Sequence, residues 1–274
     1  MSGVILAYLA QPGSARSLLL AAQHLASLCT AQRINVLAVR RPPIETIIPS
    51  EEVLTPDRET RVRTEEQQRV TALKADFDRW AAELPAAGPS TEWFDIEANA
   101  ATAIKEHGGR ADVIVLKRPG DSDPAPQRQA QRDALFEAER PMLAVPPGWA
   151  PTGFGRRVLI AWRDDPRTVK AVLWSLHLLD AAECIDIVQG LRVGLPAAGL
   201  PAIFREHGIA ATLHSLKLPG AGAFGAAVLT AAETLGSDLL VMGAYAHSPL
   251  HNFILGGVTA HMLAHAEIPV LLRH

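Results

Sequence analysis

VLIAW, at residues 158–162, repeats the short apolar pattern of VILAY at residues 4–8. After each stretch comes a turn, and then a run in which apolar residues recur every three or four positions, the spacing of a helix that buries one face. Three further pairs of apolar stretches match in the same order: Ile34–Val39 with Cys184–Val188, Ala111–Leu116 with Ser237–Met242, and Arg140–Val145 with Ile268–Leu272. The chain therefore contains two copies of one unit.

The two copies differ in their second helix. The first has a long helical pattern, roughly Pro56 to Leu84, with one apolar stripe made by Val70, Leu73, Phe77, Trp80 and Leu84. The second has only a short stretch, about Ala197 to His207, after a Gly- and Pro-rich run. The turn-rich segment PPGWAPTGFG, at residues 146–155, separates the copies. We expect two domains, at residues 1–148 and 155–274.

Strands that alternate with helices, and are almost continuously apolar, indicate a parallel sheet covered by helices on both faces. Each copy reads β-α-β-α-β-α-β-α-β, so the sequence predicts an α/β protein with two tandem, open, five-stranded parallel sheets. In such sheets ligands bind beyond the carboxyl ends of the strands, where the strand order reverses. This points to the loops after the first and fourth strands of each copy.

Composition excludes several classes of function. The 274 residues are 48% apolar and 20% charged, with a net charge of −3, which favours neither nucleic acid nor an anionic membrane as a partner. No apolar run reaches the roughly 18–20 residues that span a bilayer. The N-terminal residues read as a strand rather than a signal peptide, because they lack a basic region and break at Pro12-Gly13. Two distant cysteines suit a reducing compartment, so we expect a cytoplasmic protein.

Glycines lie at both ends of the segment that follows the fourth strand of the second copy. Gly243 directly follows Met242, and Gly256-Gly257 precedes a helical pattern at residues 258–265. A helix N-terminus offers unpaired N–H groups to a phosphate, and glycines let the backbone come close. Glycines at a strand end and before a helix are also ordinary turn residues. Both interpretations, a phosphate loop and a plain turn, stay open on spacing alone.

The repeat, the five-strand pattern and this loop together resemble the universal stress protein family in its tandem form, along essentially the whole chain. Nucleotide-binding members carry G-x2-G-x9-G-(S/T) after the fourth strand, and the corresponding residues here are Gly243, Ala246, Gly256 and Gly257. The resemblance implies the strand order 3-2-1-4-5 and an adenine nucleotide alpha hydrolase-like fold. It also implies that the copies pair through their last strands, Met142–Val145 with Val270–Leu272, and a homodimer is possible.

For function, the resemblance implies non-catalytic binding of ATP or another adenine nucleotide in the C-terminal domain, with a regulatory role in stress. Arg163 or Asp164 would meet the base, and Val188 would lie beside the ring or ribose. The loop residues expected at the phosphates are Met242, Gly243, Ala246, His247, Gly256, Gly257 and Val258. In the first copy Lys117 stands in place of Gly243, so that loop is degenerate.

Two of the four signature positions depart from the family. If the second glycine needs a positive φ, Ala246 costs about 1 kcal/mol or more. Gly257 keeps its N–H but has no hydroxyl for a phosphate oxygen. We therefore expect weakened binding. The alternative function is an interaction or structural stress protein that has lost the nucleotide.

Catalytic and metal-binding patterns are missing from the sequence. It has no GxSxG and no GxxxxGK(S/T), so we expect no enzyme activity. His261 and His265 have a spacing that can serve a metal, but no HExxH surrounds them, and we expect no metal. Acidic and basic residues alternate along the long helix, including Glu66 and Arg69, and we expect them to pair on its solvent face.

Overall fold

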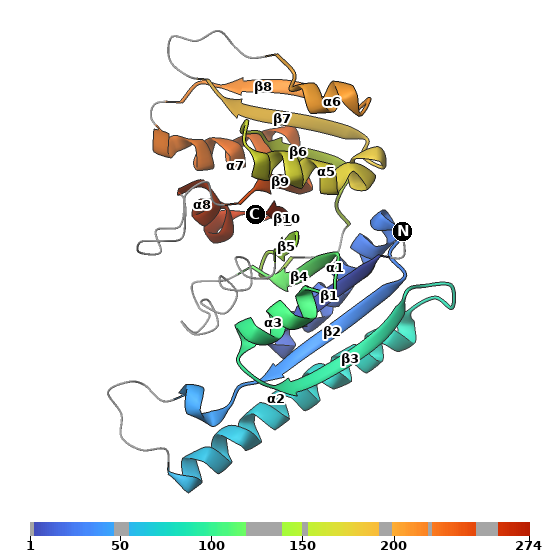
Figure 1. The fold of residues 1–274 in the computed structure, drawn as a ribbon, viewed down its shortest axis with the longest axis vertical. Coiled ribbons are helices and arrows are strands. Elements are labelled where there is room, and N and C mark those ends of the chain that lie inside the picture. The colour runs from blue at the N-terminus through green and yellow to red at the C-terminus, as the bar shows by residue number, and fades with distance from the viewer. Residues whose placement is uncertain are drawn as a thin grey trace. The chain divides into compact units, whose positions relative to one another are not determined.

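Parallel strands and their connecting helices make up both halves of the chain (Figure 1). The structure, a computed structural model, describes residues 3–46, 55–118, 139–149, 153–191, 199–218, 221–244 and 257–274. These residues form two compact units. The last strand of the N-terminal unit ends at Lys117. The C-terminal unit comprises Arg118 and the described residues from Pro141 to His274.

The N-terminal unit has four parallel strands in the order β3-β2-β1-β4. Helices α1 and α2 pack against each other on one face, and α3 contacts β1 and β2 on the other (Figure 1). Its elements are β1 (Val4–Leu9), α1 (Pro12–Cys29), β2 (Arg33–Arg40), the 3-10 helix η1 (Pro43–Thr46), α2 (Pro56–Glu83), β3 (Ser90–Glu97), α3 (Ala100–Gly108) and β4 (Val113–Lys117).

The C-terminal unit has five parallel strands in the order β8-β7-β6-β9-β10, and β5 pairs antiparallel with β10. Its elements are β5 (Met142–Val145), β6 (Arg157–Ala161), α5 (Pro166–Asp180), β7 (Cys184–Gly190), α6 (Ala202–Glu206), β8 (Thr212–Leu216), the 3-10 helix η2 (Ala221–Ala223), α7 (Phe224–Leu235), β9 (Leu239–Gly243), α8 (Gly257–His265) and β10 (Val270–Arg273).

The predicted α/β class and the order 3-2-1-4-5 are confirmed in the C-terminal unit, whose strands β6 to β10 follow that order. One detail differs, because β5, the fifth strand of the first copy, is grouped with the C-terminal unit. Its residues pair with β10 in the register Leu143 to Leu271, as the family resemblance implied. All four residues of β5 are buried, so this short strand needs a partner strand to satisfy its backbone.

A carboxylate at the start of the fourth strand plays the same part in both copies. Asp112 accepts a hydrogen bond of 2.8 Å from the backbone nitrogen of Val4, where β1 begins. Asp238 accepts from three backbone nitrogens before and at the start of β6, those of Gly155 (2.7 Å), Arg156 (3.2 Å) and Arg157 (3.2 Å). The repeat therefore extends beyond the apolar pattern to a polar contact that fixes two neighbouring strands.

The long helix of the first copy is confirmed almost to the residue as α2, with Val70, Leu73, Phe77 and Trp80 buried. In the second copy the corresponding helix is α6, a short helix that buries Phe204. Among the described residues, no helix combines the length and apolar character that crossing a membrane requires.

Candidate functional site

The strand order of the C-terminal unit reverses at β6. The connection after β6 leads to β7 on one side, whereas β9, on the other side, connects onward to β10. Ala161 at the end of β6 pairs with Val188 of β7 and with Met242 of β9. The two strand ends of this copy that the sequence singled out, those of β6 and β9, are therefore neighbours, with Val188 of β7 beside them, at the place where α/β sheets bind their ligands.

Gly243 lies at the end of β9, directly against the first turn of α5. A Cβ atom at Gly243 would lie 2.7 Å from the backbone nitrogen of Thr168 and 2.8 Å from its hydroxyl oxygen. Such distances are not tolerated, so the close packing of β9 on α5 requires glycine here. Thr168 is itself buried. This glycine therefore has a packing role in the fold, whatever the loop beyond it binds.

The turn between β6 and α5 is exposed and ends in a helix cap. Asp165 accepts hydrogen bonds from the backbone nitrogens of Arg167 (2.9 Å) and Thr168 (3.0 Å), and Pro166 opens the helix. Arg163 lies 3.5 Å from Asp165 and its side chain is 62% exposed. Asp164 is also exposed. The two residues expected near a base thus lie at the rim of the switch point, open to solvent.

Met242 and Val188 are both buried, and Val188 has no exposed surface. The backbone nitrogen of Trp162, just after β6, donates to the carbonyl oxygen of Val188 at 2.8 Å. Trp162 is buried and meets Phe204 of α6 edge-on, with ring centroids 5.5 Å apart. Apolar packing therefore closes the strand ends on the side of α6.

Helix α8 begins at Gly257, which is exposed, and continues through the half-buried Val258. No described residue lies within 4 Å of a Cβ atom placed at Gly257, so the described part of the unit leaves room for a larger residue there. The other predicted loop residues, Ala246, His247 and Gly256, lie outside the described residues. The backbone N–H groups at the start of α8 are the donors that this end of the unit presents to an anion.

The rings of the two histidines of α8, His261 and His265, are in contact at a tilt of 53°, with ring centroids 4.5 Å apart. Burial, and then the neighbouring His265, lower the pKa of His261. Helix α7 comes close to His261, because Gly225 has no side chain there. No set of three or more His, Cys, Asp or Glu within the described ranges could hold a metal ion.

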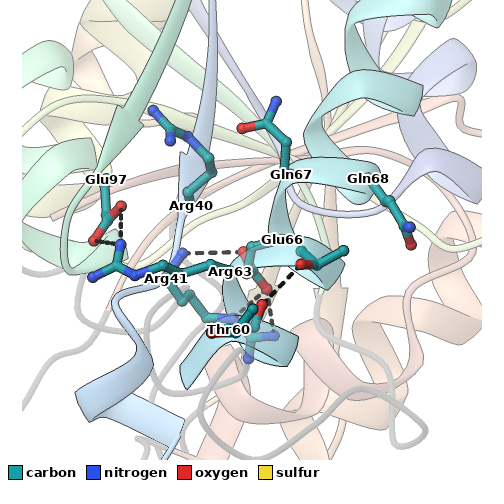
Figure 2. Close-up of a pocket in the computed structure, with 9 residues that line it drawn as sticks. Arg40, Arg41, Thr60, Arg63, Glu66, Gln67, Gln68 and Glu97 are labelled. Carbon is teal, nitrogen blue, oxygen red and sulfur yellow. Dashed lines mark hydrogen bonds and ion pairs between the residues drawn. The ribbon is translucent and has the colours of Figure 1, made fainter. Parts of the chain in front are cut away.

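The N-terminal unit has a different arrangement at the same end of its sheet. Arg69 of α2 donates to the carbonyl oxygen of Ala10 after β1 (2.7 Å) and to that of Val39 in β2 (2.5 Å). Arg69 also donates to Glu66 (2.6 Å), whose second carboxylate oxygen accepts from the Arg41 guanidinium (2.9 Å). Figure 2 shows Arg41 and Glu66 facing each other. Side chains of α2 therefore bridge the ends of β1 and β2.

Glu66 is the buried charge of this network. Burial by itself would raise the pKa of its carboxyl, but hydrogen bonds from Arg69 and from the Arg41 backbone and side chain outweigh burial and lower the pKa. The prediction that Glu66 and Arg69 pair on the solvent face of the helix is wrong about where the pair lies, since Glu66 is only 5% exposed. They do pair, but toward the sheet.

Sequence reasoning missed two residues of the C-terminal site. Thr168 was not recognised as the neighbour of Gly243, although its position three residues after Asp165 marks the first turn of a capped helix. Arg273 lies beside Gly243 in the register of β10 and β9, and supplies a cationic residue at this end of the sheet. Only the strand register, which the sequence does not give, places Arg273 there.

Comparison with known proteins supports the fold over the whole chain. Residues 220–274 match the Universal stress protein family. A universal stress protein from Archaeoglobus fulgidus is similar in structure, with a TM-score of 0.73 and 14% identity, over 100% of this chain and 96% of that one. The resemblance to this family is thus confirmed, in sequence for the C-terminal part and in fold throughout.

Other solved structures are similar to this chain in fold. A functionally unknown protein from Pseudomonas aeruginosa PAO1 has a TM-score of 0.62 and 15% identity, over 98% of this chain and 92% of that one. The cytoplasmic domain of a prokaryotic cation chloride cotransporter has a TM-score of 0.53 and 13% identity, over 99% of this chain and 95% of that one. Among curated proteins, none matches the chain. At these identities the likeness concerns the fold.

Proposed function

We propose that this universal stress-type protein binds ATP or another adenine nucleotide in its C-terminal unit, without catalysis, and acts as a regulatory stress protein in the cytoplasm. The observation that carries the proposal is the pairing of Ala161 with both Val188 and Met242, which puts the β6 and β9 ends side by side at the reversal of strand order. The sequence match at residues 220–274 covers β9 and α8 of this same site.

In this proposal the phosphates lie at the N-terminus of α8. The backbone donors there include Gly257 and Val258, and Arg273 contributes a positive charge at the end of β10. Arg163 and Asp164 are exposed in the turn after β6, where they can contact a base. A guanidinium can stack on an aromatic base, and a carboxylate can accept from an amino group.

A second candidate function is an interaction or structural stress protein that no longer binds nucleotide. One observation favours it: contact with Thr168 accounts for glycine at position 243 without any ligand. A glycine kept for packing would persist after the loop had lost its affinity for phosphate.

Calorimetry with ATP, ADP and AMP, on the full chain and on two variants at one position, separates the candidates. Gly257→Asp puts a carboxylate at the start of α8, where it suits the helix dipole but repels a phosphate, and no described residue lies within 4 Å of the added Cβ atom. Gly257→Ser is the matched control, because it is neutral and restores the hydroxyl found in the family's motif.

We expect ATP to bind the natural chain, to bind the Ser variant at least as tightly, and to be lost from the Asp variant. An absence of binding at about 1 mM ATP, a concentration that detects even weak sites, would remove the first candidate and leave the second. Equal affinity in the Asp and Ser variants would show that the phosphates do not lie at α8.

A further inference from the structure

A cavity of about 440 Å³ lies in the N-terminal unit, at the carboxyl ends of β2 and β3 beside the first turns of α2. This volume is in the range of roughly 300–1,000 Å³ that small-molecule sites occupy. Figure 2 shows Arg40 from the end of β2, Glu97 from the end of β3, and side chains of α2 around it. Every described residue that lines the cavity has a polar or charged side chain, which favours a polar ligand.

Part of the lining is fixed. The Glu66 side chain is 7% exposed, and its two oxygens accept hydrogen bonds from the Arg41 backbone nitrogen (3.0 Å), the Arg41 guanidinium and Arg69. Breaking such a network would leave a buried charge unpaired, which is strongly unfavourable. Glu66 and Arg41 therefore form a fixed part of the lining, held by Arg69 from outside the cavity, and do not exchange partners.

Two other arginines, Arg63 and Arg40, can exchange their carboxylate partners for a ligand. Arg63 of α2 holds both oxygens of Glu97 at 2.8 and 2.9 Å through one nitrogen and Glu59 at 3.1 Å through another, and its side chain is 50% exposed. Arg40 holds Asp95 at 2.7 Å, and each of these side chains is 30% exposed. Solvent-exposed pairs of this kind contribute little to stability. An incoming oxyanion can replace either carboxylate, which then turns to water.

The α2 residues at the cavity share one side of the helix. Thr60, Thr64 and Gln67 follow one another at spacings of four and three, and Gln68 lies beside them. The apolar stripe of α2 begins only at Val70. The first turns of α2 thus offer hydroxyl and amide groups where an ordinary core-facing helix would offer apolar ones.

We propose that this cavity binds a small organic anion with two or more phosphate or carboxylate groups, held by the Arg40 and Arg63 guanidiniums. Planar guanidinium groups pair with both kinds of oxyanion through two parallel hydrogen bonds. The two arginines come from different elements, a strand end and a helix, so a ligand with two anionic groups engages both. This site lies in the N-terminal unit and uses neither a glycine loop nor a base contact, so it is separate from the proposed nucleotide site.

The experiment is calorimetry of the full chain with inorganic pyrophosphate and with citrate, at constant ionic strength. The variant Arg40→Gln/Arg63→Gln removes both exchangeable guanidiniums, one from a half-buried position at the end of β2 and one from an exposed position on α2. Arg16→Gln/Arg33→Gln is the charge-matched control, since these arginines form exposed pairs with Glu83 (2.9 Å) and Glu92 (3.4 Å) elsewhere in the same unit. The two probes show whether phosphate or carboxylate groups are preferred, and neither carries a base.

We expect at least one probe to bind, the double variant to bind it about tenfold more weakly or worse, and the control to bind as the natural chain does. The variant Gly257→Asp should leave this binding unchanged, which separates it from the nucleotide site. No binding of either probe at about 10 mM would overturn the proposal. Equal losses in the control and the double variant would overturn it too, because the effect would then be one of overall charge.

Discussion

Gly243 and Thr168 are in contact so close that any side chain on Gly243 would reach within 2.7 Å of the Thr168 backbone nitrogen. The contact joins the end of β9 to the first turn of α5. It shows that a glycine in a family motif can be required by the packing of two elements as well as by a ligand.

Replacing Gly243 by alanine should destabilise the C-terminal unit by about 1–3 kcal/mol, because the added methyl group forces α5 away from β9. Urea unfolding curves of the two proteins measure the difference. The control is Gly257→Ala, at a position with open space, where we expect a change within about 0.5 kcal/mol. Equal stability of Gly243→Ala and the natural chain would show that α5 adapts freely.

Glu66→Gln should destabilise the N-terminal unit by about 3 kcal/mol near neutral pH, since it leaves Arg41 and Arg69 without a balancing charge. The folded-state pKa of Glu66 is lowered, so its contribution is complete above the unfolded-state pKa of about 4.3 and is lost as the pH falls through the folded-state pKa. Stability of the natural chain should therefore fall with acid more steeply than that of the variant.

Unfolding free energies measured between about pH 3 and pH 7 test this difference. Parallel curves for the natural chain and Glu66→Gln would mean that the pKa of Glu66 is the same in the folded and unfolded states. Glu65→Gln provides the control, because Glu65 is exposed on the same helix and its pair with Arg61 has a separation of 3.9 Å.

The two strand-start carboxylates should differ in their contribution to stability. Asp238→Asn removes the charge and replaces one of the two oxygens that accept from three backbone nitrogens with an amide nitrogen, which donates, and we expect a cost of about 1–2 kcal/mol. Asp112→Asn affects one such bond at an exposed position, and we expect less than about 1 kcal/mol. Thermal unfolding of both variants shows which of the two loses more stability. A larger loss for Asp112→Asn would contradict the hydrogen-bond argument.

Both cysteines should react slowly with a thiol reagent at pH 8 in the folded chain. Burial, and then the nearby Asp112, raise the pKa of the Cys29 thiol to about 12. A hydrogen bond to Asp186, and then burial, raise the pKa of Cys184. Because the thiolate is the reacting form, absorbance of the released chromophore should rise slowly, and both thiols should react quickly once urea unfolds the chain. A fast phase in the folded chain would contradict one of these environments.

The sequence was enough to predict most elements of the fold, because the buried strands are nearly uninterrupted apolar runs and α2 has a regular stripe. It did not locate β3 or β8, whose mixed polar and apolar residues lie in edge strands with only partial burial. The sequence also did not predict that Glu66 is buried against the sheet. A carboxylate flanked by arginines on a helix looks like a solvated residue until the sheet beneath it is known.

The candidate site was predicted in part. Spacing and resemblance selected Met242, Gly243 and Val188, and the register confirms that the strands carrying them are neighbours through β6. The packing of Gly243 on Thr168 depends on how α5 approaches β9, which is a tertiary contact. The alternation of residues along one strand carries no such information.

The antiparallel pairing of β5 with β10 determines where a stable fragment of this chain can begin. A fragment that starts at residue 155 would leave one edge of β10 without a partner, and open strand edges recruit other chains. A fragment that starts at Pro141 retains β5 and covers that edge. In the full chain β5 thus covers the edge of β10, and so prevents the second copy from associating with other chains through that edge.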